Sequence, residues 1–203
     1  MRIMILRSSP PSPYGRKVKI AAALLGLSEK IEIVPTDTID PADSIRQQNP
    51  LGKIPALILA DGAVIYDSRV IVEYLDISAG GGKIIPQGAE RIQTLTLQAL
   101  ADGIMDAAIL QMYERRFRDE DRREAKWIAH QQGKIDRALS YLEERGVSLH
   151  ATPLIGEIAL ACALGYLDLR FEGAWRAKHP KLVAWLDRFA AAVPAFEKTR
   201  VTS

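Results

Sequence analysis

The chain has 203 residues, of which 48% are hydrophobic and 26% are charged, with 27 basic against 25 acidic side chains. These proportions are typical of a folded globular protein and exclude a disordered or fibrous chain. A chain of this length buries roughly 70% of the surface that its unfolded state exposes, so it needs neither a metal ion nor disulfides to hold a core. One compact unit and two small domains both fit this length.

The apolar runs are too short for a membrane span or a secretion signal. The longest, 20–27 and 158–167, fall well short of the roughly 20 residues that a membrane-spanning helix needs. Only four consecutive apolar residues precede Arg7, fewer than in the apolar region of a signal peptide. The single cysteine, Cys162, cannot form an intramolecular disulfide or a multi-thiolate metal site. We therefore expect a cytoplasmic protein that does not enter a membrane.

Basic and acidic side chains are evenly distributed along the chain. Residues 1–80 hold nine of each sign, and the remaining residues hold 18 basic and 16 acidic side chains. The most highly charged stretch, 114–124, contains five arginines and five acids, so its charges neutralise one another. We expect this stretch to be a solvated helix end and turn. The distribution argues against nucleic acid as a partner, because such binding needs a strongly basic surface.

The first 78 residues alternate strand-like and helix-like patterns. Apolar residues recur at helical spacing from Val18 to Leu25, and Gly26 follows where a helix stops. Asp61-Gly62 between two apolar runs predicts a β-hairpin. The expected elements are a strand at 2–7, a helix at 16–27, a strand at 31–34, a short helix near 42–48, strands at 56–60 and 63–66, and a helix at 67–78. This β-α-β-α-β-β-α order predicts an α/β domain with the thioredoxin-like fold.

Glycine and long helical patterns mark the second half of the chain. The stretch 79–83 is rich in glycine and is the best candidate for a linker. Beyond it the strand signals disappear, and helices are expected at 89–117, 119–145, 154–169 and 180–191, with a short piece after Pro194. We therefore expect two domains, the α/β domain at 1–80 and an all-helical bundle at 81–203.

Ser12 stands directly before Pro13, at the start of the first expected helix. Proline is favoured in the first turn of a helix, so Ser12 is the expected N-cap. Its hydroxyl then lies where free backbone N–H groups and the positive end of the helix dipole converge, which suits an anion. Taken alone, the pair also fits an ordinary capping serine, and Ser9 before Pro10 is a competing candidate.

Pro55 opens a strand within the segment NPLGKIPAL. Proline cannot donate a hydrogen bond to a sheet ladder, so it belongs at the first residue of a strand or on an edge. A cis Ile54–Pro55 bond would turn the Ile54 backbone outward, where its N–H and C=O could pair with an extended peptide ligand. A strand that simply starts at Pro55 is the alternative.

Asp67 and Ser68 stand at the start of the helix expected at 67–78. An acid followed by a hydroxyl at a helix N-terminus can bind a zwitterion, because the helix end and Ser68 accommodate a carboxylate while Asp67 accommodates an ammonium group. An aspartate that only caps the helix is the alternative.

Taken together, these motifs resemble those of the cytosolic glutathione transferases. The segments SPYGRKV, NPLGKIPAL and YDSRVIVEYL follow one another in the α/β half, and IALACALGYLD lies in the helical half. The similarity spans nearly the whole chain. The segment ALADGIMDAA and the order of both domains are most similar to the bacterial YibF-like branch. The resemblance implies the two-domain glutathione transferase fold, glutathione as co-substrate and a homodimer.

By this resemblance Ser12 is the catalytic residue, which donates a hydrogen bond to the glutathione sulfur. Ile54, ahead of a cis Pro55, pairs with the cysteinyl backbone of glutathione. Lys53 approaches the glycyl carboxylate.

The resemblance also assigns Asp67 and Ser68 to the γ-glutamyl end of glutathione, and Asp67 stands where many members have Glu or Gln. The chain departs from the family where a helix of the second domain usually opens with a Ser or Thr three residues before an acid. Here Leu154 stands three residues before Glu157, so we expect Thr152 or water to cap that helix instead.

The function implied by the resemblance is conjugation of glutathione to a small hydrophobic electrophile, or reduction of a hydroperoxide with it. Tyr14 is expected to border the electrophile pocket. Four further side chains either line this pocket or belong to the core, namely Met105, Met112, Tyr113 and Trp127. A noncatalytic member of the family, used for glutathione binding, dimerisation or docking, is the alternative.

Two residue types are expected to carry no chemistry. Cys162 lies in an apolar run and is expected to be a buried packing residue, so mixed-disulfide exchange lacks a protein thiol. The three histidines, His130, His150 and His179, are widely separated, and we assign no metal.

Overall fold

The computed structural model describes residues 3–201, which form an α/β part followed by a helical part. The α/β part consists of β1 (Met4–Ser8), α1 (Pro13–Leu24), the 3-10 helix η1 (Ser28–Lys30), β2 (Ile31–Pro35), α2 (Ile45–Gln48), β3 (Ala56–Ile58), β4 (Val64–Ile65) and α3 (Ser68–Ser78). The helical part consists of α4 (Ala89–Phe117), η2 (Glu120–Arg122), α5 (Ala125–Arg145), α6 (Ile155–Phe171), η3 (Ala174–Lys178), α7 (Pro180–Ala192) and α8 (Pro194–Lys198). The predicted fold class is confirmed.

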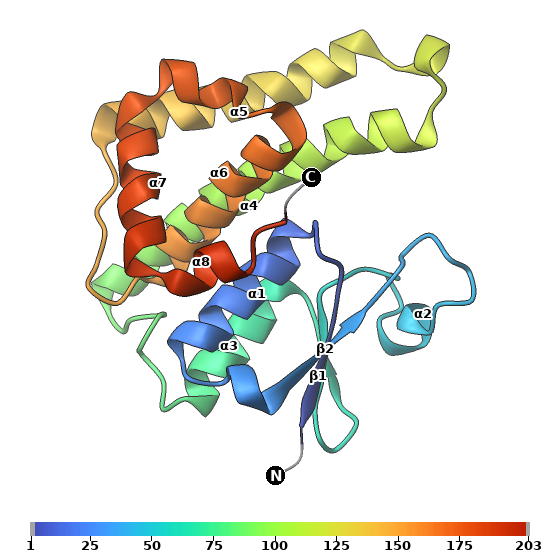
Figure 1. The fold of residues 1–203 in the computed structure, drawn as a ribbon, viewed down its shortest axis with the longest axis vertical. Coiled ribbons are helices and arrows are strands. Elements are labelled where there is room, and N and C mark those ends of the chain that lie inside the picture. The colour runs from blue at the N-terminus through green and yellow to red at the C-terminus, as the bar shows by residue number, and fades with distance from the viewer. Residues whose placement is uncertain (1–2, 202–203) are drawn as a thin grey trace.

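The four strands form one mixed sheet in the order β2-β1-β3-β4. β1 runs parallel to β2 and antiparallel to β3, which is antiparallel to β4. The β3–β4 pair confirms the hairpin predicted from Asp61-Gly62, and Gly62 has the positive φ, 89°, that its turn needs. α1 and α3 lie on one side of the sheet, toward the helical part, and α2 lies on the other side (Figure 1).

The helix predicted at 119–145 begins later than expected. The structure has the short η2 there, and α5 starts only at Ala125. The Glu124 carboxylate accepts the Lys126 N–H at 3.0 Å and so caps α5. The Glu114 carboxylate accepts the Glu124 N–H at 3.2 Å, which holds the preceding turn against the end of α4. Acidic side chains therefore interrupt the helical pattern by bonding to the backbone.

α6 is the central helix of the helical part. It is apolar on all sides, as a helix surrounded by other helices must be, and it packs against α4 and α1. Gly156 allows the close approach of α4, because a Cβ atom at that position would lie 2.6 Å from the Thr94 carbonyl oxygen. α6 therefore joins the helical part to α1 of the α/β part.

The N-terminus of α6 is not capped by Thr152. Leu154 is the N-cap residue, and the Glu157 carboxylate accepts its N–H at 2.7 Å. A leucine side chain cannot accept a hydrogen bond, so only this half of a capping box forms. The Ile84 carbonyl instead accepts the Ile155 N–H at 2.8 Å. The connection between the two parts thus supplies the backbone acceptor.

Asp76 fastens the glycine-rich connection that follows α3. Its buried carboxylate accepts the N–H groups of Gly82, Lys83 and Ile84 at 2.7, 3.0 and 2.9 Å. A carboxylate that accepts several backbone hydrogen bonds fixes a loop strongly, because each bond is charge-assisted. This segment is therefore held in one conformation although it contains three consecutive glycines.

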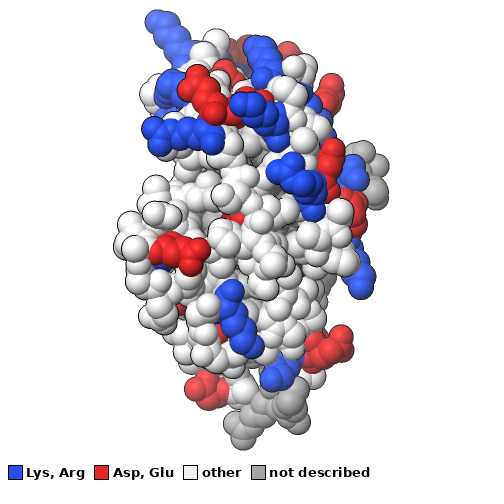
Figure 2. Space-filling view, turned by 90° about the vertical axis from the view of Figure 1, so that its left-hand side faces the viewer, with Lys and Arg blue, Asp and Glu red and all other residues white. Residues whose placement is uncertain are grey.

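Charged side chains of both signs are intermixed on the surface. Figure 2 shows that they gather toward the two ends of the side it presents, while the middle of this side has few of them. The expected ion pairing within 114–124 is present as an Arg118–Glu114 contact of 3.2 Å. Within residues 3–201, no helix is both long and apolar enough to cross a membrane.

Asp76→Asn is expected to destabilise the fold by about 2 kcal/mol, because it removes charge-assisted hydrogen bonds and turns an amide donor toward a backbone N–H group. Urea denaturation followed by circular dichroism measures the change. Glu144→Gln, at an exposed position of α5, is the control and is expected to leave the stability within 0.5 kcal/mol or so. Equal stabilities of the two variants would contradict the role given to Asp76.

Candidate active site

The end of β1 and the start of β3 lie side by side. In the antiparallel register of these strands, Arg7 is opposite Ala56, the first residue of β3. Pro55 therefore lies beside the end of β1 at Ser8. From Ser8 the chain continues through a short loop to Ser12, so the first two predicted motifs meet at this end of the sheet.

The third motif reaches the same end through β4. This strand pairs Ile65 with Leu57, so extending the register by two residues brings Asp67 opposite Pro55. The topology of the sheet thus brings the three segments together, although they are far apart in the sequence. The register thus brings Pro55 and Asp67 to this end of the sheet, and Lys53, Ile54 and Ser68 are their neighbours in the chain.

Ser12 caps α1, as predicted. Its Oγ accepts the Gly15 N–H at 3.1 Å, and Pro13 is the first helical residue. The Ser9 carbonyl accepts the Ser12 N–H at 3.1 Å, so the Ser9 backbone shapes the preceding turn. A hydroxyl that accepts one hydrogen bond keeps its own proton to donate. Ser12 can therefore cap the helix and donate to an anion at the same time.

Tyr14, in the first turn of α1, is tied to the helical part. Its hydroxyl hydrogen-bonds the Asp106 carboxylate of α4. Burial, followed by this hydrogen bond, raises the pKa of Tyr14 well above its usual range. The hydroxyl stays protonated with its donor directed at Asp106, so it does not compete with Ser12 for a bound anion.

The Ile54–Pro55 peptide bond is cis, one of the two alternatives that the sequence left open. Ile54 is half-buried, and Lys53 before it is exposed to solvent. The Asn49 side chain donates a hydrogen bond to the Lys53 carbonyl at 2.9 Å. The end of α2 therefore holds the backbone that leads into the cis bond.

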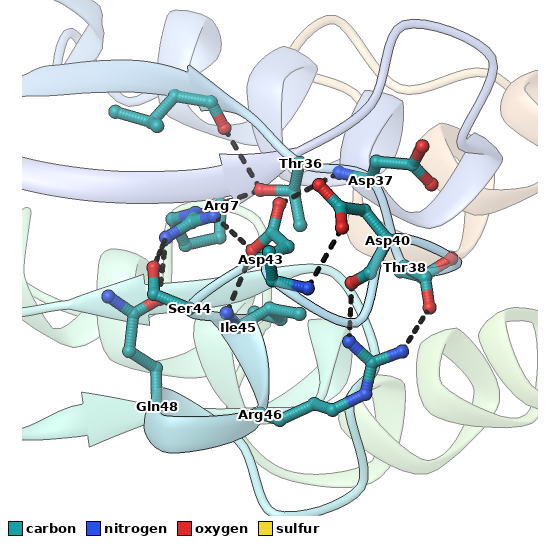
Figure 3. Close-up of polar contacts among 12 residues, drawn as sticks. Arg7, Thr36, Asp37, Thr38, Asp40, Asp43, Ser44, Ile45, Arg46 and Gln48 are labelled. Carbon is teal, nitrogen blue, oxygen red and sulfur yellow. Dashed lines mark hydrogen bonds and ion pairs between the residues drawn. The ribbon is translucent and has the colours of Figure 1, made fainter.

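A buried arginine fastens α2 to the sheet (Figure 3). The guanidinium of Arg7, at the end of β1, donates to Thr36 Oγ1 at 2.8 Å and to Asp43 Oδ1 at 2.7 Å. One of its terminal nitrogens donates to Ser44 Oγ and to Gln48 Oε1, each at 2.9 Å. Arg7 is only 7% exposed, so its charge is compensated by this cluster.

The loop before α2 is closed by further hydrogen bonds within the same cluster. The N–H of Ile45, aided by that of Asp37 and by the charge of Arg7, lowers the pKa of Asp43. Arg46 donates to two backbone carbonyls of the loop at 2.6 and 2.9 Å (Figure 3). A loop held this firmly gives α2 and the following Asn49 a defined position.

Asp67 and Ser68 stand at the N-terminus of α3, as predicted. Asp67 is the N-cap, and its Oδ1 accepts the Arg69 N–H at 2.9 Å. Ser68 is buried, with 3% of its surface exposed. The Arg69 side chain points back to the helical part, where its Nε donates to Asp102 Oδ2 at 2.8 Å.

Asp102 of α4 joins three helices through one buried carboxylate. Its second oxygen pairs with the Lys17 ammonium of α1 at 2.7 Å, and the side chains of both residues are almost completely buried. Lys17 and Arg69 thus bind opposite oxygens of one carboxylate. This contact ties the first turns of α1 and α3, which carry Ser12 and Asp67, to the same point on α4.

A cavity of about 650 Å³ lies beside Ser12, between the β1–α1 loop and the helices α6, α7 and α8. Its walls combine apolar side chains with charged ones, several of which are already paired. Asp168 is one of these, because Arg176 binds both of its oxygens, at 2.9 and 2.6 Å. The wall also includes three prolines next to Ser12 and two side chains of α6, namely Pro10, Pro11, Pro13, Tyr166 and Leu169.

Arg16 closes the inner side of this cavity. Its guanidinium lies 4.0 Å from the centre of the Phe196 ring and donates to the Phe196 carbonyl at 2.6 Å and to Thr199 Oγ1 at 3.2 Å. Gly165 of α6 leaves room for it, since a Cβ there would lie 2.5 Å from Arg16 Nη1. Burial lowers the pKa of Arg16. α1 is thereby fixed to the C-terminal helix α8.

The aromatic and methionine residues considered for the electrophile pocket do not line this cavity. Met105 is completely buried, which agrees with the core, one of the two alternatives that the sequence left open for it. Met112 is half-buried, while Tyr113 and Trp127 are 45% and 40% exposed. These residues follow the helical period of α4 and α5, and the pattern alone does not tell a core face from a pocket wall.

Cys162 lies behind the cavity wall without any exposed surface. Burial raises the pKa of its thiol to about 11. At neutral pH the side chain is therefore a thiol and not a nucleophilic thiolate. Within residues 3–201, no three His, Cys, Asp or Glu side chains are grouped so that they could hold a metal ion.

Comparisons with known proteins identify the family. The model for the glutathione S-transferase N-terminal domain matches residues 11–77, and that for the C-terminal domain matches residues 125–188. The uncharacterized GST-like protein YibF of Escherichia coli (strain K12) is 32% identical over 185 residues, which cover 89% of this chain and 90% of YibF. The chain belongs to the glutathione transferase family.

Solved glutathione transferases have the same fold. A family member from Pseudomonas fluorescens Pf-5 with bound glutathione is 40% identical, with a TM-score of 0.91 over 98% of this chain and 100% of that one. A second structure of the same family member, with bound S-(propanoic acid)-glutathione, has a TM-score of 0.87 over the same shares of each chain. A glutathione S-transferase from Methylobacillus flagellatus KT with bound glutathione is 35% identical, with a TM-score of 0.90 over 98% and 100%.

The residues that hold the motifs of this glutathione transferase in place were not predicted from its sequence. The partners of Asp102 lie 85 and 33 positions away and those of Arg7 lie 29 to 41 positions away, and no local pattern signals such pairs. The cavity wall on α6, α7 and α8 was missed for the same reason. One signal of such a pair was available in the sequence. Lys17 is a charged residue inside an otherwise apolar helical face, which indicates a buried partner of opposite charge.

Asp102→Asn is expected to destabilise this glutathione transferase by about 3–5 kcal/mol, because it leaves the buried Lys17 ammonium without a counter-charge. Urea denaturation measures the loss. The double variant Lys17→Met/Asp102→Asn removes that ammonium and is expected to recover a large part of it, since Arg69 is half-exposed and can be hydrated. A double variant that is no more stable than Asp102→Asn alone contradicts this explanation.

Proposed function

We propose that this glutathione transferase binds glutathione along the edge of the sheet, ionises its thiol at Ser12, and joins the sulfur to a small electrophile or reduces a hydroperoxide with it. The observation that carries the proposal is the position of Ser12. It caps α1 beside the cis Ile54–Pro55 bond and borders the cavity between the two parts of the chain. Relatives that are 35% and 40% identical over their whole length contain bound glutathione, which supports it.

Ser12 donates its free hydroxyl proton as a hydrogen bond to the glutathione sulfur. A free thiol has a pKa of about 8.5 and is only a few per cent ionised at neutral pH, and lowering this pKa by about two units takes about 2.7 kcal/mol. A partly buried helix N-terminus contributes up to about 2 kcal/mol, and a hydrogen bond to a charged group about 1.5–3 kcal/mol. Together they are sufficient.

The remaining predicted residues hold the peptide of glutathione. The Ile54 backbone pairs with the cysteinyl unit, and exposed Lys53 attracts the glycyl carboxylate. Asp67 and Ser68 at the start of α3 hold the ammonium and the carboxylate of the γ-glutamyl unit. Because Asp67 is exposed and already accepts the Arg69 N–H with one oxygen, its other oxygen is available for the ammonium group.

In the conjugation step the thiolate sulfur forms a bond to an electrophilic carbon. The electron pair of the bond that breaks goes to the leaving group, or to the neighbouring carbon of an activated alkene, which then takes up a proton. The thiol proton leaves to solvent when glutathione ionises. The cavity beside Ser12 holds the electrophile, and its mixed walls suit one that carries a polar group. The S-(propanoic acid)-glutathione in a 40% identical relative supports this choice.

The division near residue 80 is part of the same proposal, with 1–80 as the glutathione-binding domain and 81–203 as the helical domain. Its proposed location is the cytoplasm, where glutathione is kept in its reduced form. A chain with a single cysteine forms no intramolecular disulfide, so it does not depend on an oxidising compartment.

Ser12→Ala is expected to lower turnover about ten- to a hundredfold and to leave glutathione affinity nearly intact, because one hydrogen bond to the developing thiolate is lost while the peptide contacts remain. Steady-state kinetics with a chloronitrobenzene and an organic hydroperoxide, together with calorimetric titration of glutathione, measure both quantities. Ser9→Ala and Cys162→Ala are the controls, and both are expected to retain turnover.

Each outcome of these measurements bears on one part of the proposal. Turnover that is unchanged in Ser12→Ala but lost in Ser9→Ala would transfer the catalytic role to Ser9. Turnover that is lost in Cys162→Ala would contradict the assignment of the thiol to glutathione. Retention of the wild-type protein on immobilised glutathione without turnover of any electrophile would favour a noncatalytic binding protein. If the protein does not bind glutathione, both the conjugation and the peroxidase activity are contradicted, and a docking role remains.

We further propose that the protein is a homodimer, formed through one apolar face on α3 and α4. Val70 and Ile77 are seven residues apart on one side of α3, and 52% and 66% of their surfaces are exposed. Ile92, at the start of α4, is 67% exposed. The Glu73–Arg91 ion pair of 2.5 Å links the two helices between these residues. An exposed group of large apolar side chains rimmed by paired charges fits a subunit interface.

Ile77→Glu/Ile92→Glu is expected to dissociate this dimer, because burying two unpaired carboxylates costs several kcal/mol. Light scattering after size-exclusion chromatography is expected to give twice 22.4 kDa for the wild type and 22.4 kDa for the variant. Ile39→Glu, at an exposed apolar residue in the loop before α2, is the control and is expected to remain a dimer. A wild-type protein of 22.4 kDa contradicts the proposal.

A further inference from the structure

A second cavity, of about 550 Å³, lies inside the helical part between α4, α5, α6 and η3. It touches Leu167 and Phe171 of α6, whereas the cavity beside Ser12 touches Gly165 and Leu169. At 100° per residue these two pairs lie on opposite faces of α6, so the helix separates the cavities. In the described part of the chain, Glu172 at the end of α6 is the one residue that touches both.

One wall of the second cavity is apolar and aromatic. Ile135 and Leu139 of α5 and Leu167 of α6 are buried, and so is Trp175 of η3. The Phe171 ring lies beside them and is only half-buried. Such a wall favours a hydrophobic body, since a ligand ring or chain placed on it leaves water.

Three cationic side chains also line this cavity, Arg115, Arg170 and Lys178. None of them takes part in the ion pairs formed within residues 3–201. The Nε atom of Arg170 is buried and finds no hydrogen-bond acceptor among these residues. A buried guanidinium nitrogen without an acceptor is costly, and a carboxylate is the group that satisfies it best.

The acids of the same cavity, Asp136 and Glu172, form no ion pair with these cations within residues 3–201. Asp136 already accepts a hydrogen bond from Gln132 at 2.8 Å, and Glu172 is exposed to solvent at the end of α6. The guanidinium of Arg115 lies 5.9 Å from the centre of the Phe171 ring, so a cation and the apolar wall meet at one point. A ligand with an anionic group next to a ring or chain matches this arrangement.

We propose that this cavity binds a small amphiphilic carboxylate. The carboxylate accepts hydrogen bonds from Arg170 and lies within the field of Arg115 and Lys178, and the hydrophobic body packs against Phe171 and Trp175. The site is separate from the proposed glutathione site and makes no use of Ser12.

Calorimetric titration with 2-naphthoate tests the proposal, with 2-naphthalenemethanol as the neutral probe of the same shape. Naphthoate is expected to bind at least about tenfold more tightly than the alcohol, since the alcohol lacks the charge. Arg170→Gln is expected to weaken naphthoate binding about tenfold or more. Arg115→Gln and Lys178→Gln lie at exposed positions that tolerate substitution, and each is expected to weaken it about two- to fivefold.

Two arginines serve as matched controls. Arg188→Gln changes an exposed residue of α7, and Arg200→Gln changes an exposed residue that borders the cavity beside Ser12. Both are expected to bind naphthoate as the wild type does, and saturation with glutathione is expected to leave this binding unchanged. The proposal is overturned by absence of binding, by equal affinity in all variants, or by an affinity that falls in Arg200→Gln but not in Arg115→Gln.

Discussion

The arrangement of the site depends on one buried carboxylate. Asp102 binds the Lys17 ammonium with one oxygen and Arg69 Nε with the other, at 2.7 and 2.8 Å. In the low dielectric of the interior such charges attract strongly, but each also loses its hydration, so the group is stable only with all partners present. The two cations come from α1 and α3, and the carboxylate comes from α4. The helix N-termini at Ser12 and Asp67 are therefore fixed relative to one another by the helical part, which itself contributes neither residue.

The α/β part positions its share of the site by a different means. The antiparallel register of β3 against β1 and β4 brings Pro55, Ser8 and Asp67 to one end of the sheet. The connection before β3 has no strand partner and is held instead by Arg7, whose buried guanidinium gathers the loop and α2. Both Arg7 and Asp102 are buried charges with several partners. In each case a charge that cannot leave the interior holds a segment that hydrophobic packing alone would leave free.

The parts of the site that could be predicted from the sequence follow local rules. Ser12 before Pro13 and Asp67 before a helical pattern are N-caps whichever fold surrounds them, and Asp61-Gly62 specifies a hairpin from four residues. The order of the elements was sufficient for the fold class. Local patterns were insufficient in two places. The spacing of Met105 fits a pocket wall and a core face equally, and burial places it in the core. α5 starts six residues later than the helical period indicates, because Glu124 and Glu114 bond to the backbone. The partners of Arg7 and Lys17 are likewise distant in sequence.

The single cysteine illustrates how burial separates packing from chemistry. Cys162 lies directly behind the wall of the cavity beside Ser12, where an electrophile would also meet a protein thiolate. A thiolate there would lose its hydration, and this loss outweighs the attraction of Arg16 and Lys17, so its pKa rises to about 11. At neutral pH this side chain is therefore a thiol, far less ionised than a free thiol of pKa about 8.5. In the proposed site, the helix terminus at Ser12 would shift the glutathione thiol in the opposite direction. If glutathione binds as proposed, hydration and hydrogen bonding give its thiol and that of Cys162 opposite reactivities, which directs an electrophile to the ligand and protects the core.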